Sequence, residues 1–151
     1  MKAIETDRLI IRDWQDSDVA EFAKINADNE VMRFLQSVLS EDESNSFYQR
    51  IIAELQTEPY GLYAIEEKST GDFLGYVGFH KIMFDCDFRG RVEIGWRLKA
   101  LCWNQGYATE AVKRVLQIGK EIGLNKIYSF TAIPNRPSER VMQKIGLKKR
   151  G

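Results

Sequence analysis

This chain of 151 residues has little histidine and little cysteine. Its one histidine is His80, and its two cysteines, Cys86 and Cys102, stand in no pattern of metal ligands. A site built from several histidines or cysteines is therefore excluded, and no metal is expected. We expect both cysteines to be free thiols in a reducing compartment rather than a disulfide. His80 lies near a predicted strand end, where we interpret it as structural.

The chain also lacks an excess of either charge, because 22 Lys and Arg residues balance 22 Asp and Glu residues. A net charge of zero gives no general reason to expect nucleic acid or an anionic membrane as partner, so neither is predicted. No run approaches the roughly twenty apolar residues of a membrane helix, and the first residues lack the apolar segment of a signal peptide. We therefore expect a cytoplasmic protein.

Repeats, low-complexity tracts and long linkers are missing too, so residues 1–151 are predicted to form a single domain. With 44% hydrophobic residues, a chain of this length can bury a substantial core. Neither the Gly-Lys-Ser of a P-loop nor a Gly-x-Gly-x-x-Gly motif is present, which argues against a site for ATP or NAD.

The most informative segment that is present is a glycine turn at residues 103–111, Trp-Asn-Gln-Gly-Tyr-Ala-Thr-Glu-Ala, which opens directly into a helix. The first N–H groups of a helix lack intrahelical partners, and the helix dipole adds about half a positive charge there. Such groups can hold a pyrophosphate without a dedicated Lys or Arg. The residues that would supply them are Gln105, Gly106, Tyr107, Ala108 and Thr109. An ordinary strand-to-helix connection with a glycine at the bend is the alternative.

The helix after this turn has one apolar face and a glycine at its end. The face comprises Ala108, Ala111, Val112, Val115, Gly119 and Ile122, and Gly123 stands where a left-handed cap belongs. Residues 91–98 before the helix and 126–133 after it are predicted strands. The three elements would make a strand, helix, strand crossover with the glycine turn at its entrance.

The first half of the chain predicts a short strand at residues 8–14 and two helices. Asp16 to Asp18 are expected to cap the first helix, and Ser40 with Glu43 has the form of a capping box for the second. Residues 62–67 and 73–81 are predicted strands joined by a hairpin turn. With the strand at 91–98 they would form consecutive antiparallel neighbours.

Four segments together resemble the GNAT family of N-acetyltransferases, and within it the ribosomal-protein-alanine and ribosomal-protein-serine acetyltransferases. They are residues 5–12 (Glu-Thr-Asp-Arg-Leu-Ile-Ile-Arg), 92–96 (Val-Glu-Ile-Gly-Trp), 103–111, and 135–147 (Asn-Arg-Pro-Ser-Glu-Arg-Val-Met-Gln-Lys-Ile-Gly-Leu). The resemblance implies an α/β (mixed α+β) fold with a central, mostly antiparallel sheet and helices on both faces. Trp103 departs from the Arg or Gln of the family's acetyl-CoA signature, as in many members of this branch.

The resemblance also implies acetyl-CoA as co-substrate and direct transfer of its acetyl group to an amine in a ternary complex. The pantetheine arm would pair like an extra strand with the backbone of Trp96, Leu98 and Ala100. The N–H of Leu98 would polarise the thioester carbonyl. Asn135 would bind the pantetheine amide, although Asn before a helix is also an ordinary cap.

An alkyl amine is largely protonated at neutral pH, so the reaction needs a base. Glu93 is the candidate base, acting through a water, but strand alternation allows two faces and a solvent-facing or ion-paired Glu is the alternative. By resemblance, Ser138 is the candidate acid for the departing thiolate, although Ser in a first helical turn often bonds locally. Other branches use a Tyr where this chain has Met142, which has no proton to give.

The acceptor is expected to be a primary amine, either a protein N-terminal amine or a small molecule. A CoA-binding sensor or interaction module without turnover is the alternative, and it would not need Glu93 and Ser138. The family usually ends in two antiparallel strands, of which residues 146–151 supply only the beginning of the first. We therefore expect a piece of a longer protein or a homo-oligomer whose neighbour covers the open edge, with an incompletely walled acceptor side.

Overall fold

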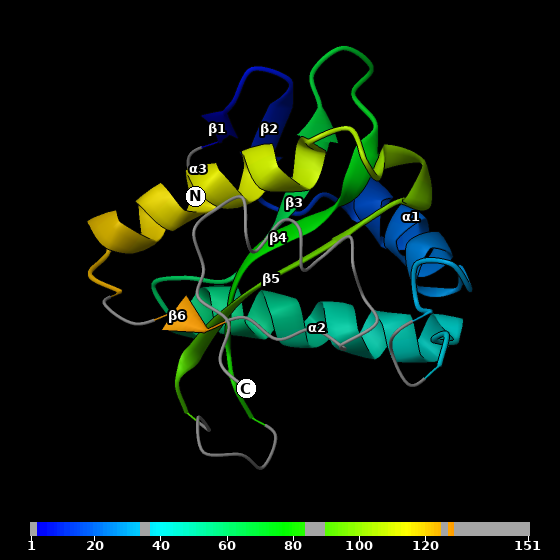
Figure 1. Ribbon diagram of the computed structural model, residues 1–151. Coiled ribbons are helices and arrows are strands. Elements are labelled where there is room, and N and C mark those ends of the chain that lie inside the picture. Colours follow the sequence, from blue (N-terminus) through cyan, green and yellow to red (C-terminus); the bar gives the residue numbers. More distant parts are fainter. Residues whose placement is uncertain (1–2, 34–36, 84–89, 125–126, 129–151) are drawn as a thin grey trace.

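The computed structural model describes residues 3–33, 37–83, 90–124 and 127–128 (Figure 1). Within these ranges the chain forms a six-stranded sheet whose strands lie in sequence order. The strands are β1 (Ile4–Glu5), β2 (Leu9–Arg12), β3 (Leu62–Glu67), β4 (Phe73–Lys81), β5 (Val92–Leu98) and β6 (Ile127–Tyr128). Neighbours from β1 to β5 are antiparallel, and β6 runs parallel to β5. The predicted antiparallel run is thus confirmed, while residues 129–133 of the last predicted strand lie outside the described residues.

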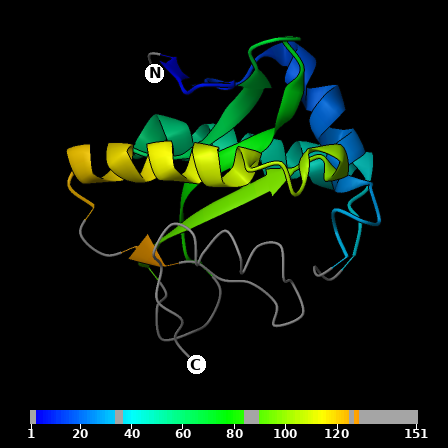
Figure 2. The same cartoon turned by 45° about the horizontal axis from the view of Figure 1, so that its top comes forward.

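Three described α-helices cover the two faces of the sheet (Figures 1 and 2). The helices α1 (Asp16–Asn26) and α2 (Glu41–Thr57) pack on one face, here called the α1/α2 face, and α3 (Tyr107–Glu121) packs on the other, the α3 face. This arrangement confirms the predicted mixed α+β architecture with helices on both faces. None of the described helices is long and apolar enough to cross a membrane.

The helix starts follow from local hydrogen bonds. Ser40 and Glu43 form the predicted capping box, in which each side chain accepts from the other residue's N–H, at 3.1 and 3.0 Å. In α1 the N-cap is Gln15 rather than Asp16, because the Asp18 carboxylate accepts a bond from the Gln15 N–H at 2.8 Å. The prediction of a helix there is confirmed, and its start is one residue earlier than expected.

The α3 helix is packed closely on the sheet and ends at the predicted glycine. Gly123 has φ +88°, and the Leu124 N–H donates to the Gly119 carbonyl at 2.9 Å, which closes the helix. A Cβ on Gly119 would come within 2.7 Å of the Phe79 ring, so only glycine permits this approach. The placement of Ile122 on the buried face is wrong, because the helix ends at residue 121 and Ile122 is 36% exposed.

The two faces of the sheet bury different kinds of side chain. The α3 face is mainly aliphatic, with Leu9, Ile11, Ile65, Val77, Phe79, Ile94, Leu98, Ala111, Val112 and Val115 among its buried residues. The α1/α2 face is rich in aromatic rings, with Phe22, Phe73 and Tyr76 buried and Trp14, Phe47 and Tyr48 packed against them. The rings of Trp14 and Phe22 meet edge to face with their centres 5.0 Å apart.

Candidate functional site

The backbone of β5 turns polar groups of Trp96 and Leu98 away from β4. The N–H of Lys99 donates to the Leu74 carbonyl on β4 at 2.9 Å. Along a strand in an antiparallel pair, successive residues direct their N–H and C=O groups to alternate sides. Trp96 and Leu98 therefore direct theirs to the opposite edge of β5, where β6 pairs only at Val92 and Glu93 within the described residues.

The chain leaves the strand immediately after these residues. Ala100 was expected to continue the extended surface, but it begins a 3-10 helix, Ala100–Cys102, and its carbonyl accepts from the Trp103 N–H at 3.1 Å. The Trp103 indole Nε1–H then donates to the Leu98 carbonyl at 3.1 Å. The residue that departs from the family's signature thus ties the glycine turn to the end of β5.

The glycine turn leaves the start of α3 open. Gly106 is the N-cap with φ +80°, and Asn104 before it also has a positive φ, +61°. No side chain of the described residues caps this end of the helix, so the N–H groups of its first turn keep their potential for an external acceptor. The Gln105 side chain is engaged elsewhere, since its Nε2 donates to the Leu101 carbonyl at 2.6 Å.

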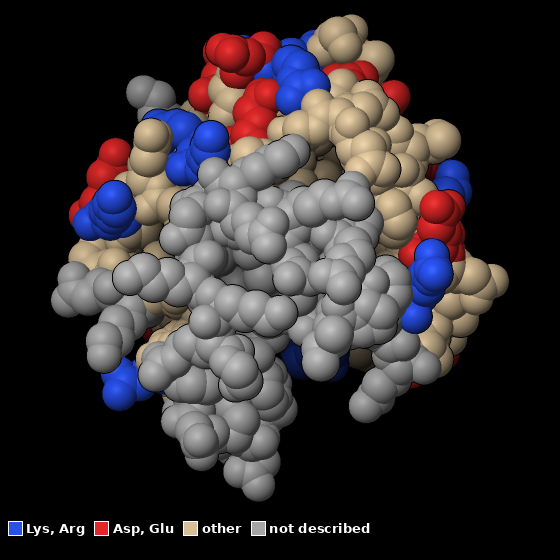
Figure 3. Space-filling model, in the orientation of Figure 1, with Lys and Arg blue, Asp and Glu red and all other residues tan. Residues whose placement is uncertain are grey.

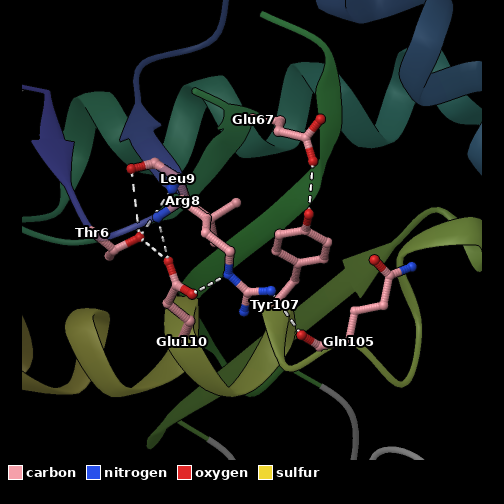
Figure 4. Close-up of polar contacts among 7 residues, drawn as sticks. All are labelled: Thr6, Arg8, Leu9, Glu67, Gln105, Tyr107 and Glu110. Carbon is pink, nitrogen blue, oxygen red and sulfur yellow. Dashed lines mark hydrogen bonds and ion pairs between the residues drawn. The ribbon is translucent and has the colours of Figure 1, made fainter. Parts of the chain in front are cut away.

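An ionic network from the connection between β1 and β2 supports this turn (Figure 4). Arg8 Nη1 donates to the Gln105 carbonyl at 2.8 Å, and Arg8 Nε donates to the Glu110 carboxylate at 2.8 Å. Glu110 also accepts from the Arg8 N–H at 2.9 Å and from the Thr6 hydroxyl. The Arg8 guanidinium carbon lies 4.2 Å from the centre of the Tyr107 ring. The role of Arg8 and Glu110 was not predicted, although both lie in segments that carry the family resemblance.

Two carboxylates in this network are held in the ionised form. Burial raises the pKa of Glu110, but the bonds from Thr6 and Arg8 outweigh it and lower that pKa below its ordinary value. The Tyr107 hydroxyl donates to Glu67 on β3 at 2.8 Å, and this bond lowers the pKa of Glu67 and raises that of Tyr107. Tyr107 is therefore fixed between Arg8 and Glu67 at the entrance to α3.

Glu93 lies on the α1/α2 face of β5. Its neighbour Ile94 is buried in the α3 core, and successive side chains of a strand point to opposite faces. Burial raises the pKa of Glu93, the nearby His80 opposes this, and Glu54 of α2 adds to it. Of the two faces that strand alternation allowed, the Glu93 side chain thus points to the α1/α2 face. Its carboxyl group lies in surroundings that favour the neutral form.

His80 and Glu54 form a pair beside Glu93. His80 is directly opposite Glu93 in the register of β4 and β5. Its Nδ1 lies 2.8 Å from a Glu54 carboxylate oxygen, and the Lys81 N–H donates to the other oxygen at 3.0 Å. The bond to Glu54 raises the pKa of His80, against the effect of burial. A base candidate, an imidazole and a second carboxylate therefore meet from three elements.

Arg97 occupies the same face of β5, next to the residue expected to polarise the thioester. Its Nη1 donates to the Asn26 side-chain oxygen at 2.6 Å, and Asn26 in turn donates to the Ser44 hydroxyl at 2.9 Å. The guanidinium carbon lies 5.5 Å from the Phe47 ring centre and 5.4 Å from that of Tyr76. A cation whose Nε and Nη2 donate to no described residue is thus held among aromatic rings on the α1/α2 face.

Several predicted features fall outside the described residues. They are Asn135, Ser138, Cys86 and the C-terminal residues 146–151. Within the described ranges no group of three or more His, Cys, Asp or Glu side chains could hold a metal ion. Figure 3 shows acidic and basic side chains interspersed around the described part of one face.

Comparison with known proteins gives consistent results for sequence and for fold. The sequence profile of the acetyltransferase (GNAT) domain matches residues 8–148. The chain is 30% identical over 151 residues to an uncharacterized N-acetyltransferase, YoaA, of Bacillus subtilis (strain 168), covering 98% of this chain and 84% of that protein.

Solved structures share the same arrangement of elements. An acetyltransferase (GNAT family) from Bacillus anthracis superposes with a TM-score of 0.82 at 27% identity, covering 99% of this chain and 86% of the other. The spermidine N-acetyltransferase from Vibrio cholerae, in complex with CoA and spermine, superposes with a TM-score of 0.76 at 18% identity, covering 97% and 84%. At that identity the second likeness concerns the fold alone.

Proposed function

Since this chain belongs to the GNAT acetyltransferase family, we propose that it acetylates the α-amine of a peptide or protein N-terminus by direct attack on acetyl-CoA. The activity as an acetyl-CoA-dependent N-acetyltransferase follows from the family. The choice of acceptor rests on one observation, the Arg97 guanidinium on the α1/α2 face beside Leu98. The alternative acceptor is the amine of a small molecule.

CoA would lie along the edge of β5 that faces away from β4 and across the start of α3. The backbone groups of Trp96 and Leu98 are directed to that edge, and they would pair with the pantetheine arm. The N–H groups of residues 105–109 would hold the pyrophosphate, and Asn135 stays the predicted ligand of the pantetheine amide. The Leu98 N–H would polarise the thioester carbonyl, and the amine would attack its carbon from the α1/α2 face.

Glu93 would take the proton of the attacking amine through water. In a straight strand Glu93 and Leu98 are about 16 Å apart, at roughly 3.3 Å for each residue. Direct contact between the carboxylate and an amine at the thioester is therefore excluded, and a chain of waters is required. Burial raises the Glu93 pKa, which makes the carboxylate a better proton acceptor than an exposed one. Ser138 stays the predicted proton donor to the departing thiolate.

The charge on Arg97 favours acceptors that carry oxygen atoms close to the amine. A peptide N-terminus offers a carbonyl beside its amine, and the Arg97 donors that bind no described residue would bind it. A polyamine offers only further cations, which Arg97 repels at a site partly shielded from water. The α1/α2 face therefore suits a peptide N-terminus better than spermidine or spermine.

The test is an acetyl-CoA turnover screen over ribosomal-protein N-terminal peptides, free amino acids, polyamines and aminoglycosides. We expect the peptides to have the highest kcat/KM. Arg97→Met should raise the KM for the best peptide about tenfold or more, because a hydrogen bond to a charged group is lost, while the KM for acetyl-CoA stays the same. Arg91→Met, at an exposed position before the same strand, is the matched control. A polyamine as the best substrate would refute the choice of acceptor.

A further inference from the structure

Arg8 contacts the glycine turn through three different groups of one side chain. Its Nη1 binds the Gln105 carbonyl, its Nε binds Glu110, and its guanidinium plane covers the Tyr107 ring (Figure 4). Its remaining nitrogen, Nη2, would lie 3.3 Å from a Cβ placed on Gly106. Arg8 thus reaches across 97 positions of sequence to the turn that precedes α3.

The bond to Gln105 fixes the direction of the next N–H. No described peptide bond is cis, and in a trans peptide the carbonyl of one residue and the N–H of the next point in opposite directions. Because Arg8 holds the Gln105 carbonyl on its own side, the Gly106 N–H is directed away from Arg8. Asn104 and Gly106 both have positive φ, so the Gln105–Gly106 peptide lies outside the regular geometry of the helix that follows.

The bonds to Glu110 reduce the repulsion between its carboxylate and a phosphate bound at the start of α3. An ionised carboxylate in the first turn of α3 stabilises the helix, but it also repels a phosphate at the helix start. The Glu110 carboxylate accepts hydrogen bonds from the Arg8 guanidinium, the Arg8 N–H and the Thr6 hydroxyl, and its side chain is only 18% exposed. Its charge is therefore largely compensated on the side that faces β1 and β2.

We propose that Arg8, anchored by Glu110 and Thr6, is a positioning residue that orients the Gln105–Gly106 peptide for the pyrophosphate of CoA. This inference rests on the proposed seat of CoA at the start of α3. It assigns a role in cofactor binding to a residue in the bend just before β2, a segment that the glycine motif does not include. Arg8 acts through the backbone of the turn, and the phosphate itself is held by the N–H groups.

The test compares acetyl-CoA with S-acetylpantetheine, which has the same thioester and pantetheine arm but no pyrophosphate. Arg8→Met should raise the KM for acetyl-CoA about ten- to hundredfold with kcat little changed, because charged hydrogen bonds that orient the turn are lost. The KM for S-acetylpantetheine should stay the same. A merely structural Arg8 would instead change both thioesters alike, or lower only the melting temperature.

Two further variants make the result decisive. Arg8→Lys keeps the charge but cannot bind Gln105 and Glu110 through one planar group, so it should also raise the KM for acetyl-CoA. Lys24→Met, which breaks an exposed ion pair with Glu21 on α1, controls for the loss of one positive charge. Normal acetyl-CoA affinity in Arg8→Lys would show that charge alone matters and would overturn the proposed orientation of the peptide.

Failure of this inference can be separated from failure of the proposed site. If Gly106→Val abolishes CoA binding while Arg8→Met leaves it intact, the seat is right and Arg8 has no part in it. If neither variant changes CoA binding, CoA does not bind at the start of α3. Should Arg8→Met not fold, the Arg8→Lys comparison of the two thioesters carries the test alone.

Discussion

The two faces of the sheet present their functional groups in different ways. On the α3 face the proposed cofactor groups belong to the backbone, at the edge of β5 that faces away from β4 and at the start of α3, over an aliphatic core. On the α1/α2 face the groups are side chains, Glu54, His80, Glu93 and Arg97, from one helix and two strands over an aromatic core. Backbone groups are common to any sequence that keeps the turn, whereas side chains differ from one protein to the next.

On this proposal, proteins of the same fold would be able to share a cofactor and differ in acceptor. A cofactor held by backbone groups needs only the right φ angles and an unobstructed approach. An acceptor recognised by side chains changes when one residue changes, without any change of fold. Changes on the α1/α2 face should therefore alter turnover and acceptor choice, and changes at the glycine turn should alter CoA affinity.

The largest effect is expected for Glu93→Gln on the α1/α2 face. Turnover at neutral pH should fall roughly ten- to ten-thousandfold, the range for loss of a general base, with little change in the KM for acetyl-CoA. In the wild type, turnover should fall as the pH drops through the raised pKa of Glu93, because the base must be ionised. That acidic limb should be absent from the pH profile of the variant.

Glu121→Gln is the matched control for this experiment, since Glu121 is exposed at the end of α3. It should leave the steady-state rate and its pH profile unchanged. Equal rates for Glu93→Gln and the wild type would mean that the base lies elsewhere.

The next largest effect concerns the stability of the α1/α2 face. Arg12 binds Asp18 through two nitrogens, at 2.8 and 3.1 Å, and Glu66 through Nε at 2.8 Å, and Asp18 is only 2% exposed. Arg12→Met would leave a buried carboxylate without its cationic partner, so the free energy of unfolding in urea should fall by about 3–5 kcal/mol. Lys24→Met, in an exposed pair, should cost less than about 1 kcal/mol. Similar losses in the two variants would contradict this ranking.

A smaller and more specific effect is expected at the glycine turn. CoA at about a hundredfold excess over its Kd should stabilise the wild type by about 2.7 kcal/mol, and NAD and ATP should not. Gly106→Val should remove the stabilisation, because valine is strained at φ +80° and its side chain meets Arg8. Gly123→Val carries the same backbone strain at φ +88°, in open space at the far end of α3. That control should melt earlier than the wild type yet keep the full response to CoA in thermal unfolding.

The smallest effect should come from His80, which faces Glu54 and Arg50 of α2 and Glu93 of β5. The Glu54 bond raises its pKa in the folded state above the ordinary 6.5, so the protonated ring stabilises the fold. This contribution is fully present below pH 6.5 and disappears as the pH rises through the folded-state pKa. Because the side chain is 39% exposed, His80→Gln should cost at most about 1 kcal/mol in acid. Urea unfolding at about pH 5.5 and about pH 8.5 should show a difference only at the lower pH.

The sequence predicts the fold well because its elements follow local patterns. The strands at Leu62–Glu67 and Phe73–Lys81 have the predicted bounds, and the capping box at Ser40 marks the start of α2. The glycine turn, too, is marked locally, since Gly106 has a positive φ of +80°, which glycine adopts without strain. Ile122 shows the limit of periodicity, which does not reveal where a helix stops.

The side-chain partners could not be predicted from local patterns. Arg8 meets Gln105, and Arg97 meets Asn26, only because distant elements pack together. The face of Glu93 depends on the register of β5, since a slip of one residue would turn every side chain to the other side of the sheet. The end of β5 before Ala100 could not be predicted from local patterns either. The strand ends at Leu98, whose carbonyl accepts a hydrogen bond from the Trp103 indole.

Gly119 gives α3 the mechanics of a lever. The missing side chain lets the helix rest on the Phe79 ring, thirteen residues after Gly106, or about 20 Å at 1.5 Å for each residue. A methyl group there would come within 2.7 Å of the Phe79 ring, so that either the helix or the ring would have to shift. Cofactor affinity should therefore respond to a substitution two nanometres from the phosphates, at a residue that touches neither CoA nor the turn.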